Sequence, residues 1–98
     1  METRNLALEI VTTVVQDMSG ELAYPSLRNV SPETPLFGGP DGIDSLSLVR
    51  IVAEVEREAE QKAGKRVVLA DERAMSMRHS PFRSVTSLAD LLAERLGE

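Results

Sequence analysis

The chain has 98 residues, of which 16 are acidic and 11 basic, for a formal net charge of −5 at pH 7. A chain of this length builds one modest core, so we expect residues 1–98 to form a single domain. It contains no cysteine, which excludes disulfides and thiolate metal ligands, and its one histidine, His79, argues against a metal site. No apolar run approaches the roughly 18 residues that a membrane span requires.

The charge pattern argues against a nucleic-acid partner. Residues 1–44 hold seven acidic and two basic side chains, whereas phosphate-backbone binding depends on clustered Lys and Arg. The three aromatic residues are too few for a base-stacking surface. The start of the chain lacks a basic segment followed by an apolar one, so we expect no secretory signal and a cytoplasmic protein. The clean start of the chain and a last predicted helix that ends at the C-terminus favour a stand-alone protein.

The first periodic segment predicts a helix over about residues 5–18. Leu8, Val11, Val15 and Met18 recur at helical spacing, and Ser19-Gly20 is a stop signal. Residues 19–43 then predict a long loop, because four prolines and four glycines interrupt any regular element. Apolar residues within this loop are expected anchors to the core: Leu22, Tyr24, Leu27, Val30, Leu36, Phe37 and Ile43.

A second helix is expected to begin abruptly at Asp44, which is a natural N-cap, and to stop at Gly64. One face carries apolar residues and the opposite face carries charge, as in an amphipathic helix. The expected core face consists of Val49, Val52, Val55, Ala59 and Ala63.

The remaining chain predicts two further helices. Asp71 is a candidate cap for a short helix through Met77, and Ser80-Pro81 interrupts the chain again. The last helix is expected to open at Ser87, with Asp90 three residues on as a capping-box pattern. Its core face is Leu88, Leu91, Leu92 and Leu96. We therefore expect an all-α fold, a four-helix bundle with a long loop between helices 1 and 2 and a short third helix.

No catalytic constellation stands out, so we expect the protein not to be an enzyme. Ser45 is not in a G-x-S-x-G elbow, and its only imidazole partner would be the distant His79. The glycine-rich run 37–42 lacks the Lys-Ser/Thr of a phosphate-binding loop. Glu54 and Glu58 are typical of a solvated helix face.

Ser45 is nevertheless well placed to receive a phosphate ester. It follows a Gly-rich loop and opens a helix, where free backbone N–H groups and the helix dipole favour an anion. The alternative is that Asp44 and Ser45 are simply good helix starters.

The wider pattern resembles the acyl carrier protein family. The resemblance rests on Thr34-Pro35-Leu36-Phe37, on Asp44-Ser45-Leu46 opening a helix, on Val68 to Glu72 before a short helix, and on Ser87-Leu88 in the last helix. It covers nearly the whole chain. It implies that Ser45 carries 4′-phosphopantetheine, donated from coenzyme A by a phosphopantetheinyl transferase, with Asp44 and Leu46 as flanking recognition residues. It further implies an arm that holds acyl groups as thioesters for acyl-loading and acyl-transferring enzymes, and a monomeric carrier.

The resemblance also implies that Val49, Val52 and Val55 line an interior where acyl chains lodge. Two departures concern the partners. Ser47 and Arg50 occupy partner-facing positions where the family usually has acidic residues, and the basic stretch 77–83 lengthens the connection before the last helix. Two other classes remain open: a small unmodified interaction module, and a regulatory helical protein that binds an acidic partner.

Overall fold

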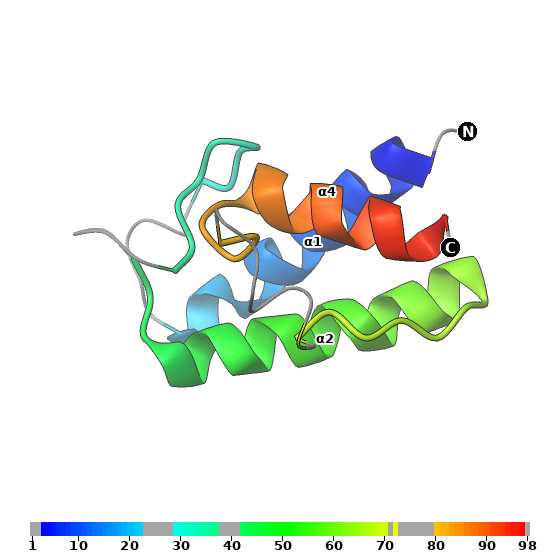
Figure 1. The fold of residues 1–98 in the computed structure, drawn as a ribbon. Helices are drawn as coiled ribbons and strands as arrows, with labels where there is room; N and C mark the ends of the chain where they lie inside the picture. The colour runs from blue at the N-terminus through cyan, green and yellow to red at the C-terminus, as the bar shows by residue number, and fades with distance from the viewer. Residues whose placement is uncertain (1–2, 23–28, 38–41, 71, 73–79, 98) are drawn as a thin grey trace.

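Three helices make up the named elements of the structure, a computed structural model that describes residues 3–22, 29–37, 42–70, 72 and 80–97. They are α1 (Thr3–Leu22), α2 (Ser45–Ala63) and α4 (Val85–Leu96) (Figure 1). The all-α prediction is confirmed. The predicted short helix over 71–77 lies almost wholly outside the described residues, so the described part holds three helices where a four-helix bundle was expected.

Helix α1 is central, because it packs against both α2 and α4. Figure 1 shows that α2 and α4 run in one direction and α1 in the other. The apolar face of α1 supplies a large share of the core, as the periodicity predicted. Its buried residues are Ala7, Ile10, Val11, Val14, Val15 and Met18, and they join Ile51, Val55, Ala59, Leu88 and Leu92 from the other helices.

Helix α1 continues past the stop that the sequence predicts at Ser19-Gly20 and ends at Leu22. The Ser19 hydroxyl donates to the backbone oxygen of Gln16 at 2.7 Å, so the serine is accommodated within the helix. A glycine inside a helix costs only about 1 kcal/mol, which packing of the preceding turns offsets.

Both predicted ends of α2 are confirmed, but part of its predicted core face is wrong. Val52, Val55 and Ala59 are buried, whereas Val49 is 62% exposed and Ala63 is also exposed. The core-facing series is instead Leu48, Ile51 and Val55, at i, i+3 and i+7. Val49 follows Leu48 directly, so its side chain is rotated about 100° around the helix axis from that of Leu48 and points away from α1.

The N-terminal cap of the last helix lies three residues earlier than predicted. Ser84, not Ser87, is its N-cap, and the Ser87 side chain completes the capping box from position N3. Asp90 therefore has no part in the cap. The earlier start places Val85 in the core at 0% exposure, which Ser87 as the first residue would not have done.

Two segments flank α2 and connect it to the rest of the fold. Residues 29–37, the leading segment, run beside residues 82–86: the Leu36 N–H donates to the Arg83 oxygen at 2.8 Å, and the Val85 N–H donates to the Thr34 oxygen at 3.0 Å. Residues 65–70, the trailing segment, turn back along α2 (Figure 1). Both segments bury apolar side chains, namely Leu36, Val67 and Leu69.

Candidate functional site

The first turn of α2 is organised by Asp44. Its backbone is extended, with φ −77° and ψ 169°, and its carboxylate accepts the Ser47 N–H at 2.7 Å. Its own backbone oxygen accepts the first helical hydrogen bond, from the Leu48 N–H at 3.0 Å. The predicted N-cap is therefore confirmed, and Ser45 is the first residue of the helix.

Ser45 is exposed at this position, and Leu46 beside it is 71% exposed. The first N–H groups of an α-helix have no acceptor within the helix, and they carry the positive end of its dipole. An oxygen at Ser45 thus lies where a phosphate group is electrostatically favoured.

The backbone just before Ser45 is tied to the start of α4. The Ile43 N–H donates to the Leu36 oxygen at 2.7 Å, and the Phe37 N–H donates to the Phe82 oxygen at 2.9 Å. Leu36, Ile43 and Phe82 are all buried beneath these bonds. Ser45 is therefore exposed on a helix start that hydrogen bonds and buried apolar side chains hold in place.

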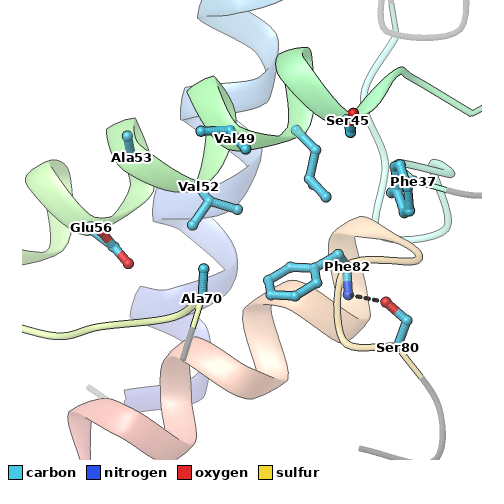
Figure 2. Close-up of a pocket in the computed structure, with 10 residues that line it drawn as sticks. Phe37, Ser45, Val49, Val52, Ala53, Glu56, Ala70, Ser80 and Phe82 are labelled. Atoms are coloured by element: carbon cyan, nitrogen blue, oxygen red, sulfur yellow. Dashed lines mark hydrogen bonds between the residues drawn. The ribbon is translucent and has the colours of Figure 1, made fainter. Parts of the chain in front are cut away.

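A pocket of about 530 Å³ begins at Ser45 and follows α2. Figure 2 shows its lining side chains from α2 on one side and Ala70, Ser80 and Phe82 on the other. Most of the lining is apolar, and the polar side chains are Ser45, Ser80 and Glu56. Among the residues that the structure describes, the lining consists of Phe37, Ser45, Leu48, Val49, Val52, Ala53, Glu56, Ala70, Ser80 and Phe82.

The residues predicted to shelter an acyl chain are only partly brought together here. Val49 and Val52 line the pocket, whereas Val55 is completely buried in the core and does not line it. Leu48, Phe82 and Glu56 do line it, although the sequence did not single them out for that role. A signal for Glu56 exists: it follows Ser45 by eleven residues, which is close to three full helical turns.

The two predicted partner-facing residues have different environments. Arg50 is exposed, as predicted. Ser47 is only 8% exposed, so its prediction as a partner-facing residue is wrong. The reason is helix geometry, because Ser47 precedes the buried Ile51 by four residues and Val55 by eight, and so lies on the same core-facing side of α2.

Several other predicted features lie outside the described residues: residues 77–79 of the basic stretch 77–83, which include His79, and the anchors Tyr24 and Leu27. Within the described ranges, no group of three or more potential metal-ligating side chains occurs. Among those same residues, no helix combines the length and apolar character needed to cross a membrane.

Comparison of the chain with protein-family models, with curated proteins and with solved structures finds no match.

Proposed function

We propose that the protein is an acyl carrier, modified at Ser45 with 4′-phosphopantetheine. One observation carries the proposal: an exposed hydroxyl at the first residue of α2 stands at the edge of a mainly apolar pocket of about 530 Å³. A hydroxyl that only started the helix would need no such pocket.

The residues at the site fit the prosthetic group. The Ser45 oxygen is accessible, the helix N-terminus favours a phosphate, and exposed Leu46 offers apolar contact to a modifying enzyme. In the loading step, this oxygen would bond to the pantetheine-bearing phosphorus of coenzyme A. The pyrophosphate bond breaks, adenosine 3′,5′-bisphosphate leaves, and the hydroxyl proton passes to a base of the transferase.

When bound, the group supplies a terminal thiol that holds an acyl cargo as a thioester. The protein's own residues bind and orient the arm, and partner enzymes turn the cargo over. The proposal includes a phosphopantetheinyl transferase and acyl-loading and acyl-transferring enzymes as partners, a monomeric cytoplasmic carrier, and a short helix over 71–77 that completes a four-helix bundle.

Intact-mass spectrometry after incubation with a broad-specificity transferase and coenzyme A tests the proposal. We expect a gain of one phosphopantetheine group, absent in Ser45→Ala and retained in Ser80→Ala, a matched serine that lines the same pocket. Ser45→Ala keeps the Asp44 cap and should therefore keep its helical circular-dichroism signal. An unmodified parent protein, or a modified Ser45→Ala variant, would overturn the proposal and favour an interaction module.

Partner choice is proposed to depend on Arg50. A transferase with a basic docking face is repelled by a positive charge on α2, and such charges act mainly on association rates. Arg50→Glu should therefore speed loading by that transferase at low salt, and the gain should shrink as ionic strength rises. An unchanged rate at low salt would mean that charge at this position does not select the transferase.

A further inference from the structure

The pocket beside Ser45 is apolar along its length but carries a carboxylate from Glu56 on the same side of α2. Ser45, Val49, Val52 and Glu56 follow one another at i, i+4, i+7 and i+11, and all four line the pocket. Eleven residues of α-helix turn the direction of the side chain by only about 20° and advance about 16 Å along the axis. Glu56 therefore lines the same pocket as Ser45 (Figure 2). Along the helix axis it lies about 16 Å from Ser45.

The Glu56 side chain is held in place from outside the helix. Its Oε2 atom accepts the backbone N–H of Leu69 at 2.7 Å, and Leu69 itself is completely buried. This bond orients the carboxylate and ties it to the trailing segment. A carboxylate has room for several hydrogen bonds, so one bond to Leu69 leaves acceptor capacity on the side that lines the pocket.

A carboxylate in an apolar wall is costly unless it is hydrogen-bonded, so it disfavours a purely hydrocarbon occupant at that point. An occupant that bears an N–H donor at that point is instead favoured, because charge-assisted hydrogen bonds are roughly twice as strong as neutral ones. The wall therefore favours an occupant that is apolar along its middle and bears a donor where it passes Glu56.

We propose that Glu56 is a specificity-determining residue that accepts a hydrogen bond from an N–H group of the pocket's occupant, either an amide of the arm or an amino group at the distal end of the cargo. This inference rests on the proposed loading of Ser45. Where the donor belongs to the cargo, the inference narrows the cargo to chains that bear an amino group able to reach Glu56, about 16 Å along α2 from Ser45.

The Leu69 backbone amide provides a local reporter, because it already donates to Glu56. The experiment follows its NMR resonance in ¹⁵N-labelled protein loaded at Ser45 with S-hexyl or S-(6-aminohexyl) phosphopantetheine, both stable thioethers. In parallel, unmodified protein is titrated with the corresponding free pantetheine thioethers. Mass spectrometry establishes loading independently.

The variants separate recognition from structure. Glu56→Gln keeps an oxygen for the Leu69 N–H but presents an amide to the pocket in place of a carboxylate. Glu60→Gln makes the same charge change on α2 at an exposed residue that does not line the pocket. Thermal midpoints of both variants show whether the fold is retained.

If a cargo amine is the donor, the Leu69 resonance moves with the aminohexyl form and not with the hexyl form. Glu56→Gln then weakens binding of the free aminohexyl probe about tenfold, and Glu60→Gln does not. If an arm amide is the donor, both forms move the resonance equally, and the movement is lost in Glu56→Gln. A resonance that no form moves, or that moves equally in Glu56→Gln, overturns the proposal even when loading succeeds.

Failure of the proposed function has a different signature. In that case the mass of the protein does not change, and the free-probe titration alone decides whether Glu56 accepts a donor in this pocket.

Discussion

The two segments that flank α2 differ in how far side chains hold them. Side-chain bonds do reach the leading segment, where the Val30 N–H donates to Gln16 Oε1 and the Thr86 hydroxyl donates to the Pro32 oxygen, but backbone bonds predominate there. In the leading segment, Leu36 and Phe37 donate through their backbones to the backbone oxygens of residues 83 and 82. In the trailing segment, hydrogen bonds join side chains to backbone groups. The Leu69 N–H reaches Glu56, the Val68 oxygen accepts from Arg95 Nη1 at 2.6 Å, and Lys65 Nζ donates to the Leu96 oxygen at 3.1 Å.

The difference predicts how each segment responds to mutation. Backbone hydrogen bonds do not depend on side-chain identity, so the leading segment should hold the start of α2 through many substitutions. The trailing segment depends on individual helix residues, above all Glu56 and Arg95. The Ser45 end of the pocket is thus held mainly by backbone bonds, while its far end can be altered by single substitutions.

The largest loss of stability should be the same in both segments, because each segment buries one leucine completely. Leu36 and Leu69 are each 0% exposed. Leu36→Ala and Leu69→Ala should each lower the free energy of unfolding by about 3 kcal/mol, measured by urea denaturation. A cost below about 1 kcal/mol for either variant would mean that its segment does not pack as described.

The next-largest loss of stability should distinguish the trailing segment from the leading one. Arg95 is 6% exposed and donates to the Val68 oxygen. Arg95→Met keeps apolar volume but removes the donor, and should cost about 2 kcal/mol, with faster hydrogen exchange at the Leu69 amide. Arg66→Met is the control, because the Arg66 side chain is 87% exposed. Equal costs for the two variants would contradict the assigned role of Arg95.

A smaller effect is expected where the trailing segment leaves α2. Gly64 has φ +68°, in the left-handed region, and a Cβ there would meet no atom within 4 Å. Gly64→Ala should therefore cost about 1 kcal/mol from the backbone alone, measured as a lower midpoint of urea unfolding. A Gly64→Ala variant more stable than the parent would show that residue 64 readily adopts a conformation outside the left-handed region.

The smallest effect should come from a side-chain bond in the leading segment. Thr34 Oγ1 accepts the Ser31 N–H at 2.8 Å, but Ser31 is exposed and water can replace the bond. Thr34→Val should cost only about 0.5 kcal/mol. A loss of 2 kcal/mol or more, about the cost expected of Arg95→Met, would show that the leading segment depends on the Thr34 side chain as strongly as the trailing segment depends on Arg95.

Local signals were reliable where both partners of an interaction lie close in the sequence. Asp44 and Gly64 were predicted as the ends of α2, and both are confirmed because each acts within one helical turn. The last helix shows the limit of such signals. Ser84 and Ser87 are both capping residues, and the choice of Ser84 follows contacts with the leading segment, where the Thr86 N–H donates to the Pro32 oxygen at 2.9 Å.

Sequence periodicity by itself determined the all-helical character, the position of α2 and the place of Ser45 at its start, because these depend on helix caps and on spacings of three and four residues. Only the tertiary structure decided that Ser47 is buried, that Val49 is exposed and that a pocket runs from Ser45 to Glu56. These features arise where residues 13 to 31 positions apart meet, as in the bonds of Glu56 and Lys65. No local pattern specifies such pairs, since packing around α1 selects them.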